Sequence, residues 1–340
     1  MSLLKKLLFA VVGTVLGLVG VNLGAAVYET LPYGVRSVDG QPTGLYAVEA
    51  GGGRPQLKRG AHIKGTQYEI TINQLGFRGA ELRAPKPDNG FRIWAIGGST
   101  TFDIYAPDDG STWPAVAGRL LQERHPDRVV EVINAGIPGE VFWGNGQDLE
   151  RLWRTVEPDV VVVYHGINDL RKAATQHLPP EGHMQKQPVD LAILRVLRRA
   201  FAAPRPIPDS WSDRRLTRNQ LGEVRRELLN FLSLAERGRI PVLLATHGLR
   251  LPQPWTANDA NRDIRDLAFI LQMPPPAVAE AVDLYNDMVQ RIARERRLPV
   301  ADVRASVPGD ARYWGDGCHF SGEGSEIAGK VVAEALDGML

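Results

Sequence analysis

Four short polar blocks along the chain carry the residue types that acyl transfer needs. The first contains Ser99, the second Gly139, the third Asn168, and the fourth holds Asp316 three residues before His319. A serine hydroxyl becomes a nucleophile when a histidine base lies within hydrogen-bond reach and an aspartate orients that histidine. A backbone N–H group or an asparagine amide can stabilise the negative charge that develops on a carbonyl oxygen. The blocks therefore predict chemistry through a covalent acyl-enzyme.

The first three blocks each follow an apolar run that is typical of a buried strand. Such runs occur at 92–96, 129–133, 160–164, 241–245 and 299–303, and amphipathic stretches separate them. One of these stretches follows Ser111, which we expect to be a helix N-cap. Strands that alternate with helices predict right-handed crossovers and a parallel sheet covered on both faces. Ligands of such sheets bind beyond the carboxyl ends of the strands, so the blocks should meet at one edge.

In order and type, the blocks resemble the GDSL, or SGNH, hydrolase family, whose name gives its Ser, Gly, Asn and His. Ser99, Gly139, Asn168 and His319 fall on those four positions and Asp316 on the triad acid, and the resemblance covers residues 91–335. The first block departs from the family name, because it reads Gly-Gly-Ser where the name expects Gly-Asp-Ser. The nucleophile survives this change.

The resemblance implies a flavodoxin-like three-layer α/β/α SGNH-hydrolase fold with a central, mainly five-stranded parallel sheet. It also implies a triad of Ser99, Asp316 and His319. The oxyanion hole would comprise the backbone N–H groups of Ser99 and Gly139 and the side-chain amide of Asn168. An α/β-hydrolase fits less well, because Thr101 stands where the nucleophile elbow Gly-x-Ser-x-Gly requires glycine.

Taken singly, each of these residues has an ordinary alternative role. A Gly-Gly-Ser turn can cap a helix, Gly and Asn are common in turns, and a lone histidine is more often structural than catalytic. A phosphate-binding loop is a poor alternative, because its lysine is absent from the first block. The joint occurrence of the four blocks in this order favours the catalytic interpretation.

Four aromatic or imidazole side chains are candidates for the pocket lining: Trp143, His165, His247 and Trp314. An indole ring can stack on a sugar or line an acyl channel, although core packing explains a tryptophan equally well. For His165 the alternative is a buried, hydrogen-bonded role.

We predict no metal, because His177 and His183 lack partners at metal-ligand spacing, and we also expect no cofactor. Cys318 is the single cysteine, so no intramolecular disulfide can form, and we expect it to be a small buried residue. The formal net charge of +1 gives no reason to expect a nucleic-acid partner.

The N-terminus predicts a membrane segment. No charged residue occurs from Leu7 to Tyr28, and Lys5 and Lys6 precede this run. A helix of about 22 residues spans about 33 Å, enough to cross a bilayer core. We therefore expect residues 1–28 to form a transmembrane signal anchor, with the catalytic domain outside the cytoplasm, in a bacterial periplasm or at the cell surface. A signal peptide cleaved near residues 24–26 is the alternative.

The remaining chain divides by composition. Residues 29–90 predict a juxtamembrane β-rich lead-in with a strand at 68–73, and residues 91–340 the hydrolase domain. A Pro-rich insertion at about 171–216 and a long connection at 249–275 are candidates for a lid or for surface insertions. No pattern indicates an oligomeric state.

Three functions compete at this point. The leading hypothesis is an exported, membrane-anchored serine esterase that hydrolyses O-acyl esters, acetyl or short acyl, on cell-envelope carbohydrate or lipid. The second is a carbohydrate O-acyltransferase with the same triad. The third is a carbohydrate-binding scaffold in which the triad is dormant.

Overall fold

The computed structural model describes residues 14, 17, 19–21, 45–47, 54, 56–65, 68–176, 178 and 206–340. The chain separates into two compact units, and the larger one comprises Tyr46–His62, Glu69–Leu178 and Ile207–Leu340. All the candidate site residues belong to this larger unit, and apart from one short strand at His62–Lys64 the following description is confined to it. His177, His183 and most of the predicted span lie outside the described residues. Over the part that is described, no helix combines the length and the apolar character needed to cross a membrane.

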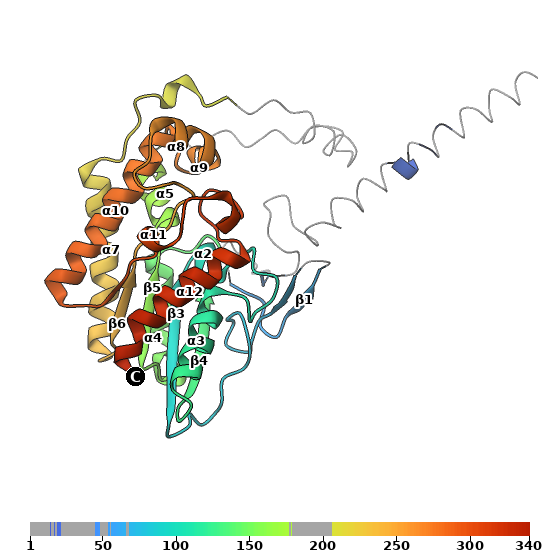
Figure 1. Ribbon diagram of the computed structural model, residues 1–340, viewed down its shortest axis with the longest axis vertical. Helices are drawn as coiled ribbons and strands as arrows, with labels where there is room; N and C mark the ends of the chain where they lie inside the picture. Colours follow the sequence, from blue (N-terminus) through green and yellow to red (C-terminus); the bar gives the residue numbers. More distant parts are fainter. Residues whose placement is uncertain are drawn as a thin grey trace, which may run out of the picture. The chain divides into compact units, whose positions relative to one another are not determined.

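A parallel sheet of five strands forms the centre of the larger unit, in the order β4-β3-β5-β6-β7 (Figure 1). Each strand coincides with one of the five apolar runs, so the predicted sheet is confirmed. The strands are β3 (Gly90–Gly97), β4 (Val129–Gly136), β5 (Val160–Tyr164), β6 (Val242–Ala245) and β7 (Val300–Ala301).

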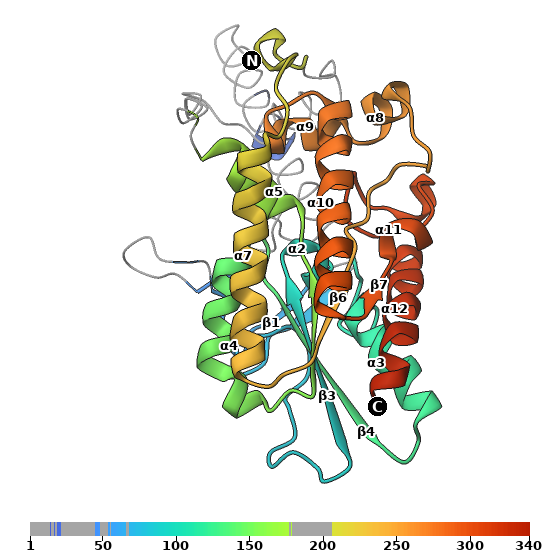
Figure 2. The same cartoon turned by 90° about the vertical axis from the view of Figure 1, so that its left-hand side faces the viewer.

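Helices cover both faces of the sheet and make three layers (Figure 2). Along β3, Trp94 and Ile96 point to one face, and Ile93 and Ala95 to the other. The first face packs against α4 (Phe142–Val156), α5 (Ile167–Thr175), α7 (Arg218–Arg237) and α10 (Pro275–Arg296). The second face packs against α3 (Trp113–Arg124) and α12 (Gly322–Leu336). Because both faces are buried, the strands read as continuous apolar runs without alternation.

Further short helices lie in the connections between these elements and after α12. The connection at 249–275 contains two of them, so it is more ordered than its length suggested. The short elements are α2 (Ser99–Phe102), η1 (Asp209–Trp211), α8 (Ala257–Asp263), α9 (Arg265–Leu271), α11 (Val303–Ser306), η2 (Ala311–Tyr313) and η3 (Asp337–Met339).

The expected N-cap of α3 is wrong by one residue. Thr112 caps the helix, with its hydroxyl accepting the Ala115 N–H, while the Ser111 hydroxyl donates to Asp108 instead. Serine and threonine are both good N-caps, so sequence alone does not distinguish two adjacent candidates.

The lead-in supplies two short strands, β1 (His62–Lys64) and β2 (Glu69–Thr71), and then enters the core. Phe77 is buried and packs edge-on against Trp94 of β3, with 5.8 Å between the ring centroids. Arg78 is also buried and its guanidinium group donates to backbone carbonyls that follow β3. This part of the lead-in therefore belongs to the same hydrophobic core as the sheet.

Gly136 at the end of β4 allows the backbone of α2 to approach the sheet. A Cβ atom at this position would lie 2.1 Å from the Phe102 nitrogen and 2.6 Å from the Thr101 carbonyl carbon. Both are backbone atoms, so a rotamer change cannot relieve the clash. Since Ser99 begins α2, the position of the nucleophile depends on this contact.

We predict that Gly136→Ala lowers the free energy of unfolding by about 3 kcal/mol, the cost of overpacking a rigid contact. Urea denaturation followed by circular dichroism measures it. Gly222→Ala in α7 is the matched control, because a Cβ atom there meets nothing within 4 Å. It should raise the unfolding free energy by roughly 0.5–1 kcal/mol, since alanine favours helix. Equal effects at the two positions would contradict the prediction.

Candidate active site

Ser99 stands at the first turn after β3, and a hydrogen bond from Thr101 fixes this turn. The Thr101 hydroxyl lies 3.0 Å from the Tyr164 carbonyl oxygen of β5, to which it donates. Gly97 leaves the space for this bond, because a Cβ atom at 97 would lie 2.1 Å from Thr101 Oγ1 and 2.2 Å from the Tyr164 oxygen. The turn that carries the nucleophile is thereby bound to the neighbouring strand.

Arg78 binds the carbonyl groups at the C-terminal end of α2. The Arg78 guanidinium lies 2.9 Å from both the Phe102 and the Asp103 carbonyl oxygens, and it forms an ion pair with Asp109 at 2.8 Å. The last carbonyls of a helix have no intrahelical partners, and a cation there also complements the helix dipole. Arg78 therefore stabilises the short helix that begins with Ser99.

Asp103 ends the same helix in a left-handed conformation with φ of 65°. Its side chain is buried, and its Oδ2 accepts from the Ser325 hydroxyl at 2.7 Å and from the Trp113 N–H at 2.9 Å. Burial raises the pKa of Asp103 to about 6, although these hydrogen bonds and Arg78 oppose the change. Asp103 thus joins α2, α3 and α12 beneath the nucleophile.

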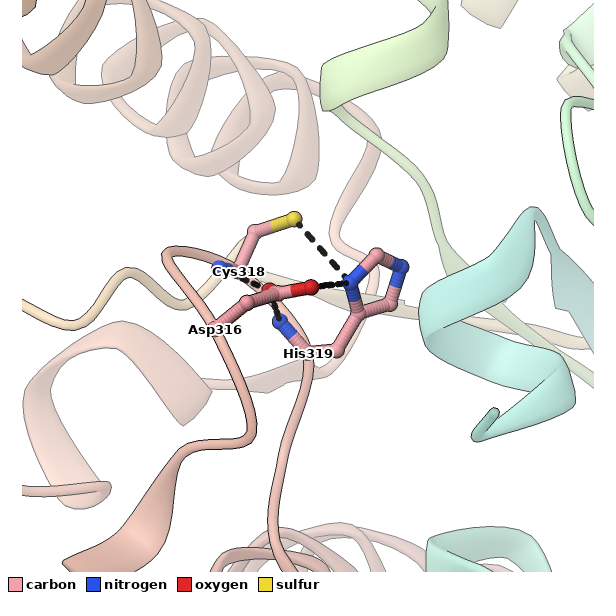
Figure 3. A group of neighbouring side chains, drawn as sticks. All are labelled: Asp316, Cys318 and His319. Atoms are coloured by element: carbon pink, nitrogen blue, oxygen red, sulfur yellow. Dashed lines mark hydrogen bonds and ion pairs between the residues drawn. The ribbon is translucent and has the colours of Figure 1, made fainter. Parts of the chain in front are cut away.

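The acid and the base lie on one loop, between η2 and α12 (Figure 3). Asp316 Oδ1 accepts from the N–H groups of Cys318, at 3.0 Å, and of His319, at 2.9 Å. The same carboxylate lies 2.7 Å from His319 Nδ1 through its Oδ2. One side chain therefore folds the loop and orients the imidazole ring.

Tyr105 packs edge-on against the imidazole of His319, with 6.0 Å between ring centroids. Gly315 makes room for it, because a Cβ atom at 315 would lie 2.4 Å from the Tyr105 ring. Sequence analysis did not identify Tyr105, and no local pattern distinguishes it from a surface tyrosine.

The predicted triad is assembled. His319 Nε2 lies 2.7 Å from Ser99 Oγ, and both side chains are partly exposed to solvent. Burial by itself would raise the pKa of Asp316, but the charge of His319 and the hydrogen bonds of the loop hold it well below the usual range. Asp316 thus stays ionised, keeps the Nδ1 proton on the ring, and leaves Nε2 free to accept the serine proton.

The second and third blocks meet beside the nucleophile. The Glu140 N–H donates to the Ile137 carbonyl at 3.0 Å and closes a turn in which Gly139 is exposed with φ of +86°. Asn168 Nδ2 donates to the Glu140 carbonyl at 3.0 Å. Only glycine adopts that φ without strain.

Gly98 brings the Asn168 amide close to the nucleophile. A Cβ atom at 98 would lie 2.4 Å from Asn168 Nδ2. The glycine at 98, where the family name has aspartate, therefore leaves the space that the Asn168 amide occupies. Ser99 is the first residue of α2, so its N–H has no intrahelical partner and is available to an oxyanion.

A network of buried polar groups supports this turn. Asp169 Oδ1 accepts from the Phe142 N–H at 2.9 Å, and Asp169 Oδ2 lies 2.9 Å from His165 Nδ1. His165 Nε2 lies 2.7 Å from Asn145 Oδ1. Of the two roles expected for His165, the structure therefore shows the buried, hydrogen-bonded one and not pocket lining. His165 supports the turn of the site from within the core.

The four candidates for the pocket lining have different environments. The Trp143 side chain is 54% exposed at the start of α4, so its ring is accessible to a ligand. Trp314 is buried and donates its Nε1–H to the Pro308 carbonyl. His247 is buried beside Tyr164, with 5.2 Å between ring centroids, and burial lowers its pKa to about 3. In the described part of the chain, only Trp143 among the four presents an open face.

Asp316, Cys318 and His319 also have the composition of a small metal site, with ligand atoms within 4.8 Å of one another. Their chemistry does not suit one. Asp316 and His319 already bind each other, and burial raises the pKa of the Cys318 thiol well above its ordinary value, whereas a metal binds the thiolate. The cluster fits a proton relay better than a metal centre.

The chain matches the sequence profile of the GDSL-like lipase/acylhydrolase family over residues 95–327. This range includes all three triad positions and the three predicted donors of the oxyanion hole. No curated protein sequence matches the chain.

Several solved structures are similar to the chain at low identity. One is a putative lipolytic protein of the G-D-S-L family from Desulfitobacterium hafniense, with 18% identity, 72% of this chain and 99% of that chain covered, and a TM-score of 0.42. A putative GDSL-like lipase from Parabacteroides merdae has 15% identity, coverages of 75% and 98%, and a TM-score of 0.45. A catalytic mutant of Axe2, an acetylxylan esterase from Geobacillus stearothermophilus, has 17% identity, coverages of 73% and 93%, and a TM-score of 0.43.

We predict that Asn168→Ala lowers kcat for an ester by about 100- to 1,000-fold, because one donor to the oxyanion is lost. Gly98→Ala should lower kcat by at least about 10-fold, since the new methyl group displaces the same amide. The displaced atom ends a flexible side chain, so the melting temperature should change little. Steady-state kinetics and thermal melting of both variants measure this, and a fully active Gly98→Ala protein would contradict it.

Asp103 predicts a pH dependence of stability. Its ordinary pKa is 3.8, and in the folded protein it rises to about 6. The folded state therefore keeps a proton that the unfolded state releases, so this stabilisation is complete below about pH 4 and is lost as pH rises through 6. At 1.36 kcal/mol per pKa unit, the loss is about 3 kcal/mol.

Denaturant unfolding of wild type and Asp103→Asn between pH 4 and pH 7 tests this titration. Asparagine tolerates the left-handed backbone and does not titrate. The stability of wild type relative to the variant should fall across this range. A constant difference between the two proteins would show that Asp103 is not the group responsible.

Proposed function

The chain belongs to the GDSL-like lipase/acylhydrolase family and is a serine ester hydrolase, and we propose that it removes short O-acyl groups from cell-envelope carbohydrate. One observation carries the mechanism: the continuous relay Ser99 Oγ, His319 Nε2, His319 Nδ1 and Asp316, with distances of 2.7 Å at both junctions. In both half-reactions, the proton moves along the hydrogen bond between Ser99 Oγ and His319 Nε2 or between His319 Nε2 and the substrate oxygen.

In the first half-reaction, Ser99 Oγ attacks the ester carbonyl carbon and its proton passes to His319 Nε2. The carbonyl oxygen becomes an oxyanion next to the amide of Asn168 and the N–H groups of Ser99 and Gly139. The bond to the alcohol then breaks, and His319 returns the proton to the departing oxygen. Asp316 stabilises the imidazolium throughout.

In the second half-reaction, His319 takes a proton from water, whose oxygen attacks the acyl-enzyme. The new bond forms first and gives a second oxyanion, the bond to Ser99 Oγ then breaks, and the proton returns to the serine. The products are a carboxylic acid and regenerated enzyme. A sugar hydroxyl in place of this water would give acyl transfer.

A carbohydrate alcohol is supported by Trp143. Its ring is 54% exposed and it lies three residues after Glu140, whose carbonyl accepts the Asn168 amide. An exposed indole ring loses the benefit of burial, and sugar rings stack well on such a face.

We also propose that residues 7–28 anchor the enzyme in a membrane with its catalytic domain outside the cytoplasm. Support comes from the uncharged run and from Lys5 and Lys6 before it. Alkaline extraction of cell membranes and protease accessibility in spheroplasts test the two parts of this proposal. Release of the full-length chain by extraction would contradict the anchor.

We predict that the purified full-length protein hydrolyses p-nitrophenyl acetate and that Ser99→Ala abolishes this turnover. Loss of the nucleophile alone typically lowers kcat by about 10⁶-fold, as much as loss of the whole triad. Turnover that survives in Ser99→Ala would exclude Ser99 as the nucleophile. A folded wild type without turnover, even on acetylated oligosaccharides, would contradict hydrolysis itself.

The exposed ring of Trp143 allows a separate test of whether the alcohol part of the ester is a carbohydrate. Trp143→Ala should raise KM for an acetylated oligosaccharide by about 5-fold, because stacking on one ring contributes on the order of 1 kcal/mol. It should leave KM for p-nitrophenyl acetate unchanged. Trp143→Phe, which keeps an aromatic face, should lie between wild type and Trp143→Ala. An equal change for both substrates would indicate a structural role.

A further inference from the structure

Arg54, which precedes the hydrolase domain in the sequence, contacts the loop of the oxyanion hole. Its Nη2 lies 2.6 Å from Asp148 Oδ2 on α4, and its Nε forms an ion pair with the carboxylate of Glu140. The Arg54 side chain is only 15% exposed. Glu140 stands 86 residues and Asp148 stands 94 residues further along the chain.

Glu140 joins the parts of the oxyanion hole through its backbone. Its carbonyl accepts the Asn168 amide at 3.0 Å, and its N–H closes the turn onto Ile137. Gly139, the donor on that turn, directly precedes it. A shift of Glu140 would therefore move two of the three donors together.

The side chain of Glu140 is confined as well as buried. It is 5% exposed, and its Oε1 accepts the Val141 N–H at 3.0 Å at the start of α4. A Cβ atom at Gly144 would lie 2.1 Å from Oε1, so the helix leaves only the space that this carboxylate fills. Its place is set on one side by the helix and on the other by Arg54.

A buried carboxylate needs a cation to compensate its lost hydration. Burial would lower the pKa of Arg54, but its hydrogen bonds and the charges of Asp148 and Glu140 raise it. Arg54 is therefore charged, and it offers two N–H donors in a fixed plane to two separate carboxylates. Without it, Glu140 would be left buried and unpaired, and it would relax by moving the turn.

We infer that Arg54 is a positioning residue of the esterase, which holds Gly139 and Asn168 in place by anchoring Glu140. The oxyanion hole would then be completed by a segment outside the part of the chain that carries the triad. This inference rests on the proposed ester hydrolysis, because the hole has its role in that reaction.

The chain offers a matched control for Arg54. Arg151 also forms an ion pair with Asp148, at 2.9 Å, but it is 50% exposed, and its contacts among the described residues do not include Glu140. Arg54→Gln and Arg151→Gln each remove one positive charge that is paired with Asp148. Only the first removes the partner of Glu140.

The experiment compares kcat, KM and the pH profile for p-nitrophenyl acetate in full-length wild type and the two variants. Arg54→Gln should lower kcat by about 10- to 100-fold, a partial loss of oxyanion stabilisation. KM and the apparent pKa of the profile should not move, because Ser99, His319 and Asp316 keep their places. Arg151→Gln should stay within about 2-fold of wild type, as exposed ion pairs contribute little.

Glu140→Gln provides a second route if Arg54→Gln does not fold. It neutralises the buried group and keeps its shape, and it should lower kcat by a factor similar to Arg54→Gln. The double variant should lose no more than about 2-fold beyond either single variant, since the two residues act as one unit. Arg54→Lys, with one point charge, should recover part of the activity.

Full kcat in a folded Arg54→Gln or Glu140→Gln protein would overturn the inference. So would an effect on KM alone, or equal losses in Arg54→Gln and Arg151→Gln. The failure of the proposed function looks different, because wild type itself would then show no turnover that depends on Ser99.

Discussion

The hydrogen bond between Ser99 Oγ and His319 Nε2 joins residues that are 220 positions apart, and the rest of the site depends on it. Neither partner is activated alone, since a neutral serine hydroxyl is a weak nucleophile. Only a fold that brings the end of β3 and the loop after β7 to the same edge can form this contact. The parallel sheet does so, because all five strands end in the same direction.

Close approach of backbone at that edge explains the glycines around the nucleophile. Gly97 makes room for the Thr101 hydroxyl, Gly98 for the Asn168 amide, and Gly136 for the backbone of α2. Residues of α2 fill the spaces at Gly97 and Gly136, and Asn168 of α5 fills the space at Gly98. The Gly-Gly-Ser block is thus the consequence of three elements meeting at one point, and a side chain at any of these positions would push one of them away.

Buried polar groups add rigidity at a cost in stability. Arg78, Asp103 and Glu140 lie beneath the site with little or no contact with solvent. Pairing a buried charge rarely stabilises a fold more than apolar packing would, but it restricts the geometries that are allowed. Here such groups hold the Ser99 helix and the Gly139 turn, where a displacement of the donors would weaken transition-state stabilisation.

Much of the fold and the triad was determined by the sequence alone. Apolar runs with intervening amphipathic stretches defined five strands and their helices. Ser99, Gly139 and Asn168 follow three of these strands, and the resemblance of the four blocks to the SGNH family added Asp316 and His319. These are local features, since hydrophobic periodicity and turn chemistry act over a few residues. Only the tertiary structure decided that Trp143 is exposed while His165, His247 and Trp314 are buried, and that Arg54 reaches Glu140. Burial and ion pairing depend on which elements pack together, and no spacing along the chain encodes a contact between residues 86 positions apart.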